Sequence, residues 1–154
     1  MNKVKILRTV LIILIVLWAY LVFTFSSHDG GESSGLSRWI VELFVKDSEL
    51  VDIIEPYVRK WAHFSEYGLG GVLFTALFST YNWTDKRVIF ISIIVGIWYA
   101  IMDEVHQIMV PGRNGALIDV YIDSLGIATG VIGMMVVIKI IDLIKNKKIV
   151  SSKV

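Results

Sequence analysis

The sequence predicts an all-α integral membrane protein with four transmembrane helices and one interfacial helical segment. Hydrophobic residues make up 55% of its 154 residues and charged residues only 19%, which is more apolar material than the core of one small soluble domain uses. Long apolar runs divide the chain, and its lysines and arginines gather between and beyond these runs. We therefore expect a single membrane domain over residues 1–154.

The composition also excludes several classes of function. The chain has no cysteine, which rules out disulfides, thiolate metal sites and a cysteine nucleophile. Its net charge is +1, and basic runs occur only near the termini, so we expect no nucleic-acid partner. The predicted partner is the lipid bilayer. The sequence predicts no cofactor and carries no signal for an oligomeric state.

The first apolar run, residues 10–25, contains no charge and follows Lys3, Lys5 and Arg8. It is long for the apolar region of a signal peptide, and the segment after it offers no small-x-small cleavage site. We expect an uncleaved first transmembrane helix at about 6–25.

Residues 26–59 form the longest polar interval. A Ser/Gly-rich linker is expected up to Ser34, followed by an interfacial amphipathic helical segment at about 36–54 with Ser34 or Ser37 as N-cap. A second apolar group, residues 50–54, is expected to end before Pro56. The alternative is that this segment forms a lid over a site. Apolar residues recur at helical spacing at Leu36, Trp39, Ile40, Leu43 and Phe44.

The other three spans are expected at about 59–80, 88–110 and 119–144. A short charged turn, residues 85–87, separates the second span from the third, and Pro111-Gly112 ends the third. In the fourth span, glycines at spacings of four and three predict a smooth face for close helix packing. These glycines are Gly126, Gly130 and Gly133.

The basic residues predict how the four spans are oriented. Short cytoplasmic loops carry an excess of lysine and arginine, and with four spans all three basic groups fall on one side. We therefore expect a multi-pass protein of the cell membrane with both termini and residues 81–87 in the cytoplasm, and with residues 26–59 and 111–118 outside. The three groups are Lys3, Lys5 and Arg8; Lys86 and Arg87; and Lys139, Lys145, Lys147, Lys148 and Lys153.

Polar residues on three spans fall at one depth in this topology. Ionisable groups are costly within a membrane and mark candidate functional sites. With Arg113 in the loop, they are expected to form one polar cluster at the extracellular face. The residues are Lys60, His63, Glu66 and Tyr67 in the second span, Asp103, Glu104, His106 and Gln107 in the third, and Asp119 and Asp123 in the fourth.

Five motifs in this order resemble the VanZ-like family of small bacterial membrane proteins, over about residues 20–135. The family's founding member is associated with resistance to teicoplanin, a glycopeptide that acts on the cell wall, and no settled reaction comes with the family. The resemblance therefore implies a membrane protein of the cell envelope with a contribution to glycopeptide resistance. The motifs are Phe25-Ser26-Ser27, Lys60-x-x-His63-Phe64-x-Glu66-Tyr67-Gly68-x-Gly70, Asp103-Glu104-x-His106-Gln107, Pro111-Gly112-Arg113 and Asp119-x-x-x-Asp123-x-x-Gly126.

The cluster predicts a site for an anionic envelope molecule, either lipid-linked or related to peptidoglycan. Lys60 and Arg113 suit a phosphate or carboxylate, while His63 and a carboxylate suit acid–base chemistry. Whether the protein is an enzyme stays open. The candidate catalytic residues are His63, Glu66, Asp103, Glu104 and His106, and the candidate binding residues are Lys60, Tyr67, Gln107, Arg113, Asp119 and Asp123.

Three alternatives remain. His63-x-x-Glu66 and Asp103-x-x-His106 have the spacing of helical metal ligands, which would give a metal-dependent membrane hydrolase, but the charges of Lys60 and Arg113 oppose a cation and we expect no metal. An ion pathway would need further polar groups across the membrane. In the third alternative, the charges serve only to fix helix packing.

Overall fold

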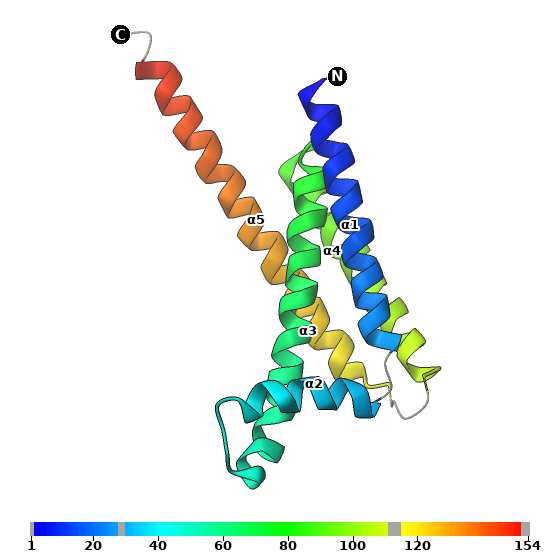
Figure 1. The fold of residues 1–154 in the computed structure, drawn as a ribbon. Helices are drawn as coiled ribbons and strands as arrows, with labels where there is room; N and C mark the ends of the chain where they lie inside the picture. Colours follow the sequence, from blue (N-terminus) through cyan, green and yellow to red (C-terminus); the bar gives the residue numbers. More distant parts are fainter. Residues whose placement is uncertain (1, 28–29, 111–114, 152–154) are drawn as a thin grey trace.

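The computed structural model describes residues 2–27, 30–110 and 115–151. This part of the chain is all helical apart from short connections. Its helices are α1 (Lys3–Ser27), α2 (Gly30–Glu42), α3 (Ser48–Phe78), α4 (Asp85–Ile108) and α5 (Leu117–Ser151), shown in Figure 1.

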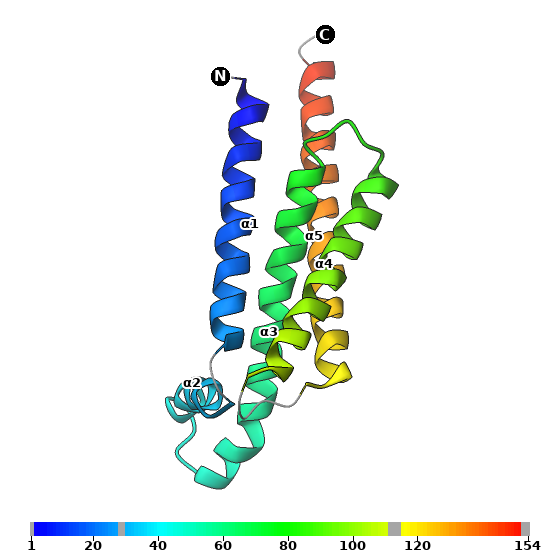
Figure 2. The same cartoon turned by 90° about the vertical axis from the view of Figure 1, so that its right-hand side faces the viewer.

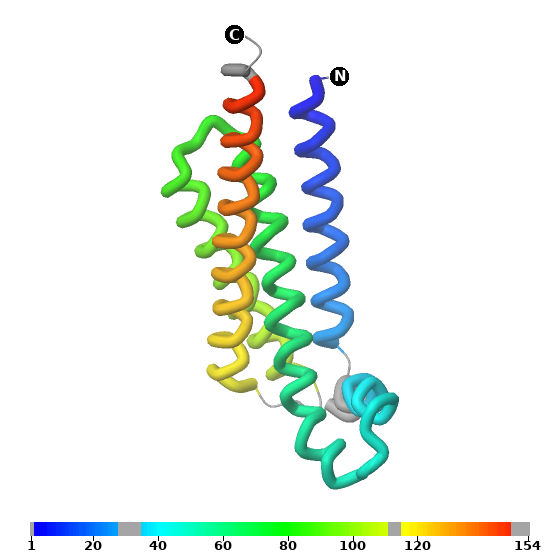
Figure 3. The backbone as a smooth tube through the Cα atoms, turned by 90° about the vertical axis from the view of Figure 1, so that its left-hand side faces the viewer, coloured from blue at the N-terminus to red at the C-terminus, as the bar shows by residue number. Residues whose placement is uncertain are grey.

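α3 is the central element of the bundle. It contacts α1, α2, α4 and α5. α2 lies across one end of the long helices (Figures 1 and 2), while both ends of the chain and the α3–α4 connection lie at the opposite end (Figure 3). The core side chains come from all four long helices: Trp18, Val22, Tyr67, Leu73, Phe74, Ala100, Ile127 and Val131.

In the described part of the chain, three helical segments are long and apolar enough to cross a membrane. They are α1 (Lys3–Ser27), α4 (Asp85–Ile108) and residues Leu117–Lys148 of α5. α3 is not among them, because His63, Ser65 and Glu66 interrupt its apolar stretch. Length and composition thus support three of the four predicted spans, and the span expected at about 59–80 is not supported on this criterion.

The prediction of one interfacial segment at about 36–54 is wrong in its boundaries. α2 ends at Glu42, and residues 48–54 are the first turns of α3, which continues through Pro56. The Asp47 side chain caps α3 by accepting hydrogen bonds from the backbone N–H groups of Glu49 (2.9 Å) and Leu50 (3.4 Å). Proline removes one helical hydrogen bond, and packing of the helix on both sides of Pro56 outweighs that loss.

α2 also begins earlier than expected. Residues 30–34 were predicted as a linker because Gly and Ser are weak helix formers, but the helix starts at Gly30, so Ser34 and Ser37 lie inside it and are not N-caps. Contacts with α3 stabilise it: the Ser37 hydroxyl donates to Glu55 (2.5 Å), and Val41 is buried.

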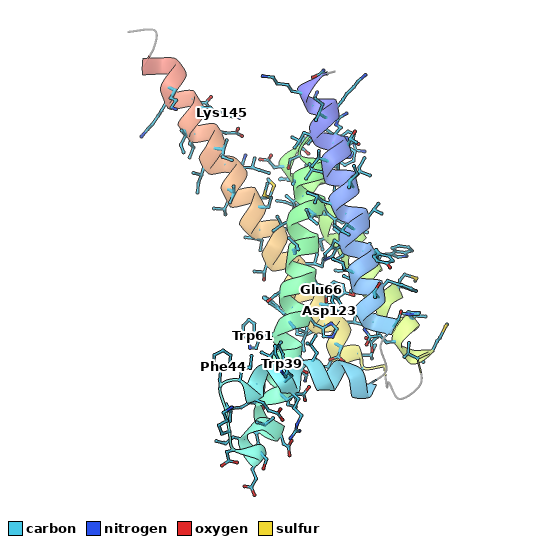
Figure 4. All side chains as sticks on the ribbon, in the orientation of Figure 1. Trp39, Phe44, Trp61, Glu66, Asp123 and Lys145 are labelled. Atoms are coloured by element: carbon cyan, nitrogen blue, oxygen red, sulfur yellow. The ribbon has the colours of Figure 1, made fainter. Side chains whose placement is uncertain are left out.

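The apolar stripe of α2 points away from these contacts. Trp39 is 58% exposed and Phe44, just beyond the helix, is 84% exposed. Figure 4 shows both near the end of the molecule where Trp61 of α3 lies, and Trp61 is 66% exposed. Leu36, Ile40 and Leu43 are exposed as well. The apolar residues whose spacing predicted an amphipathic helix therefore lie on the surface and not in a buried contact.

Glycines bring the backbones of α3 and α5 into direct contact. A Cβ on Gly130 would lie 1.9 Å from the carbonyl oxygen of Gly68, and a Cβ on Gly126 would lie 2.3 Å from that of Phe64. Only glycine allows such an approach. Gly133 has open space around it, because the C-terminal part of α5 leads away from α3 (Figure 1). The predicted glycine face is thus confirmed for two of its three members.

Polar contacts join the helices at the end that carries the termini. The Arg8 guanidinium donates to the hydroxyl (2.9 Å) and the carbonyl (2.6 Å) of Thr80 and lies over the ring of Tyr81. Lys139 of α5 forms an ion pair with Asp85 at the start of α4. These contacts fix α1, α4 and α5 at the end away from α2.

Candidate functional site

Acidic side chains from three helices lie near one another inside the bundle, toward the end where α2 lies. Asp103 of α4 and Asp123 of α5 are buried, and Glu66 of α3 is half-buried. Figure 4 shows Glu66 and Asp123 at one level, just above α2. Asp103 is close enough to both of them for electrostatic repulsion. We call Glu66, Asp103 and Asp123 the acidic cluster.

The glycine contact explains why the acidic cluster forms. Glu66 immediately precedes the turn of α3 that contains Gly68, and Asp123 lies three residues before Gly126 on α5. A Cβ on Gly68 would lie 3.5 Å from the carbonyl oxygen of Gly126. Because residues three apart share a helix face, the side of α5 that touches α3 also carries Asp123 toward Glu66.

Tyr67 lies in the centre of this region. Its side chain is fully buried, with 0% exposure, and its ring packs edge-on against Trp18 of α1 (centroids 6.1 Å apart) and beside Tyr99 of α4 (6.4 Å). The Asp103 and Asp123 carboxylates are near enough to act on its hydroxyl electrostatically. Within the described part of the chain, that hydroxyl has no hydrogen-bond partner, and neither has Asp123 Oδ1.

Trp18 and Tyr99 belong to the site, although the sequence analysis did not include them. The indole Nε1 of Trp18 donates to the carbonyl oxygen of Glu66 (2.9 Å), and the Tyr99 hydroxyl donates to the carbonyl oxygen of Ala19 (2.8 Å). Both bonds tie α1 to the helices of the acidic cluster. The sequence does contain one indication that Tyr99 belongs to the site: it precedes Asp103 by four residues and so shares its helix face.

Two predicted site residues of α4 make local contacts. The Gln107 side-chain amide donates to Asp103 Oδ2 (2.8 Å) and so orients this carboxylate one turn away. Glu104 is buried, and its Oε1 accepts a hydrogen bond from the backbone N–H of Ala116, just before α5 begins. Glu104 therefore helps to fix the α4–α5 connection.

His106 faces α1. Its ring stacks on Phe23 (centroids 4.4 Å apart, planes at 25°), and its Nε2 lies 3.1 Å from the Ser27 hydroxyl. This contact links the ends of α1 and α4. Sequence reasoning placed His106 in the site but did not identify Phe23 or Ser27 as its neighbours.

The remaining predicted residues lie at the edge of the acidic cluster or beyond it. His63 and Asp119 are half-buried, and Asp119 acts electrostatically on Asp123. Lys60 is exposed, two helical turns from the buried Tyr67. Arg113 lies outside the described residues. Ser65 donates to the carbonyl oxygen of Trp61 (2.8 Å), as expected for a helical serine.

The arrangement offers hydrogen-bond acceptors. Among the described residues, no group of three or more His, Cys, Asp or Glu side chains has the placement of metal ligands. Carboxylate oxygens accept hydrogen bonds from ligand hydroxyl or ammonium groups, and a tyrosine hydroxyl can donate or accept. Such groups can bind a polar ligand or exchange a proton with it.

The fold and the site together define a small helical membrane protein with a polar cluster buried near one end of its bundle. A comparison with protein families agrees with this class: the model of the VanZ/LLP1 family matches residues 11–139, most of the chain. The chain belongs to the VanZ/LLP1 family. In the two other comparisons, no curated protein and no solved structure matches the chain.

Proposed function

We propose that the protein binds an anionic cell-envelope molecule, lipid-linked or related to peptidoglycan, at the polar site near α2. The observation that carries this proposal is the burial of Tyr67, Asp103 and Asp123, from three different helices, at one place in an apolar bundle. Buried polar groups are expensive in a membrane protein and are kept where they serve a ligand or a pathway.

The proposed topology places this site at the extracellular face. The chain termini and the α3–α4 connection share one end of the bundle (Figure 3), and lysines and arginines are concentrated there. We assign that end to the cytoplasm. α3 would then serve as the fourth span, shielded from lipid by its neighbours, and the ends of α3, α4 and α5 that carry the site would face outward.

α2 would lie in the outer membrane interface. Its exposed Trp39, together with the exposed Phe44 and Trp61, gives this end of the molecule an aromatic surface (Figure 4). Aromatic side chains are enriched at the boundary between lipid and water, whereas the Arg38–Asp52 and Arg38–Glu42 ion pairs suit the aqueous side. A helix in this position would hold the site at the level of the lipid headgroups.

Each part of the site would bind a different part of the ligand. Lys60, which is exposed, and Arg113 would bind the anionic group. The acidic cluster and Tyr67 would accept hydrogen bonds from the remainder of the molecule. A protein that holds an envelope precursor in this way could change its availability to a glycopeptide, and we propose that a contribution to teicoplanin-type resistance follows from such binding.

The direct test is ligand capture. The purified full-length protein and two variants, Lys60→Gln and Lys145→Gln, are incubated with a lipid extract from a bacterial membrane, washed, and analysed by mass spectrometry. Lys145 lies in the C-terminal part of α5, at the end of the molecule away from α2 (Figure 4), so it is the matched control. We expect an anionic envelope molecule to be enriched by the wild type and by Lys145→Gln, and to be lost from Lys60→Gln. Equal retention by all three proteins would overturn the proposal.

A second experiment separates a functional site from a purely structural one. His63→Ala and His63→Gln are compared for folded yield and for susceptibility of the cells to teicoplanin. If the protein binds its ligand through this region, at least one variant changes susceptibility while its yield stays normal. If susceptibility changes only when yield falls, the polar residues serve packing alone.

A further inference from the structure

Two buried polar atoms in the site lack the partner that burial normally requires. Asp123 is 2% exposed and Tyr67 is 0% exposed, and neither Asp123 Oδ1 nor the Tyr67 hydroxyl has a hydrogen-bond partner in the described residues. Leaving such a group unsatisfied is destabilising. Tyr67 is next to Gly68 on α3 and Asp123 lies one turn before Gly126 on α5, where these two glycines bring the helices into contact, and the Asp123 carboxylate acts electrostatically on the Tyr67 hydroxyl.

Several acidic groups lie near this location. Asp103, Asp119 and Glu66 act electrostatically on Asp123, and Gln107 already uses an N–H group to bind Asp103. Of the two cations expected at the site, Lys60 is exposed and Arg113 lies outside the described residues. A group that donates hydrogen bonds and carries positive charge would satisfy the orphaned oxygens and be attracted by the acidic groups.

We infer that Asp123 Oδ1 and the Tyr67 hydroxyl form a binding site for a primary ammonium group, so that the ligand is a zwitterionic envelope molecule; this inference rests on the proposed function. A metal ion fits less well, because three acidic or histidine ligands do not converge in the described residues. An ammonium group needs only acceptors at hydrogen-bond distance, and it can donate to a phenol oxygen as well as to a carboxylate.

Two partly exposed acids act on the buried one. Glu66 and Asp119 are half-buried, Asp123 is buried, and both half-buried acids act electrostatically on Asp123. A cationic group that approaches from solvent would therefore reach acidic side chains before it reached Asp123. The anionic part of the same ligand would stay nearer the surface, within reach of Lys60.

Primary ammonium groups of this kind have two sources in an envelope. One is the headgroup of phosphatidylethanolamine, and the other is a free amine of a peptidoglycan stem peptide. The probes are a short-chain phosphatidylethanolamine with its N-acetylated form, and the tripeptide L-lysyl-D-alanyl-D-alanine with its fully N-acetylated form. Acetylation removes the positive charge and leaves the anionic part unchanged.

The dissociation constant of each probe is measured with the purified full-length protein. We expect at least one amine probe to bind about tenfold or more tightly than its acetylated form, the effect of a charge-assisted hydrogen bond. The probe pair that shows this preference identifies the source. Asp123→Asn, which keeps the shape of the side chain, should abolish the preference, and Tyr67→Phe should weaken it. Asp142→Asn, an exposed acid at the far end of the same helix, should leave it unchanged.

The outcomes separate this inference from the proposed function. If both forms of a probe bind equally well, the ammonium site is refuted while envelope binding stands. If no probe binds in either form, the ammonium inference fails, and the lipid-extract capture then decides the proposed function independently. Binding of the acetylated probe by Asp123→Asn shows that this variant is folded.

Discussion

The indole of Trp18 donates a hydrogen bond to the backbone carbonyl of Glu66, which ties α1 to the acidic turn of α3. The same ring fills the space beside Gly70, where a Cβ would lie 2.4 Å from Trp18 Cζ2. We expect Trp18→Phe to lower the free energy of unfolding by about 1–3 kcal/mol, through the lost hydrogen bond and the smaller ring. Thermal unfolding in detergent measures this change. Trp98→Phe is the control, because Trp98 is 60% exposed, and equal effects of the two variants would contradict the prediction.

The contact between α3 and α5 predicts opposite effects for two glycines on one helix. Gly130→Ala places a methyl group against the Gly68 carbonyl, so the helices must separate, and we expect a loss of about 1–3 kcal/mol. Gly133→Ala meets no atom and should be neutral or stabilising by up to about 1 kcal/mol, since alanine favours a helix. Folded yield and thermal stability of the two variants check this. If Gly130→Ala were as stable as Gly133→Ala, the close approach would be wrong.

The proposed topology predicts different accessibility at the two ends of the bundle. The native chain has no cysteine, so Glu49→Cys in the first turn of α3 and Asn82→Cys in the α3–α4 connection each provide a single probe, and both positions are exposed. In intact cells, a membrane-impermeant thiol reagent should label Glu49→Cys at once. Asn82→Cys should react only after the membrane is permeabilised. The reverse pattern would place the acidic cluster on the cytoplasmic side.

An interfacial position of α2 predicts that its aromatic side is in contact with lipid. A spin label at Phe44→Cys should be relaxed more by oxygen, which concentrates in lipid, than by a water-soluble paramagnetic complex. A label at Glu49→Cys, on the polar start of α3, should show the opposite preference. Electron paramagnetic resonance in vesicles measures both. If both labels prefer the water-soluble agent, the aromatic surface is available to something other than the bilayer.

Much of the helical framework could be predicted from the sequence. Uninterrupted apolar runs predicted the bounds of α1, α4 and α5 to within a few residues, except that α5 extends further at its C-terminal end. α3 was harder to predict, because Pro56 suggested a boundary that packing and the Asp47 cap override. Helix spacing also predicted that Gly126 and Gly130 would face a close neighbour. The identity of that neighbour, Gly68, depends on how the two helices cross, which no local pattern encodes.

The interior of the site could not be predicted from the sequence. Spacing and charge predicted that Glu66, Asp103 and Asp123 lie at one level of the bundle, and Figure 4 shows Glu66 and Asp123 at one level. Whether a given side chain points inward depends on neighbours from other helices. The sequence alone therefore could not show that Lys60 is exposed and that Tyr67 is fully buried. The contributions of Trp18 and Tyr99 arise from contacts across about fifty to eighty residues of sequence.

The central position of α3 has a consequence for the order of assembly. α3 lacks the apolar length by which α1, α4 and α5 could enter a bilayer independently, yet its backbone lies directly against that of α5, which the ribosome makes after α4. The polar turns of α3 therefore find their full set of neighbours only once α5 has been made. We expect the nascent α3 to wait at the membrane surface or beside the insertion machinery until α4 and α5 arrive, so that a chain truncated before α5 should be degraded rather than integrated.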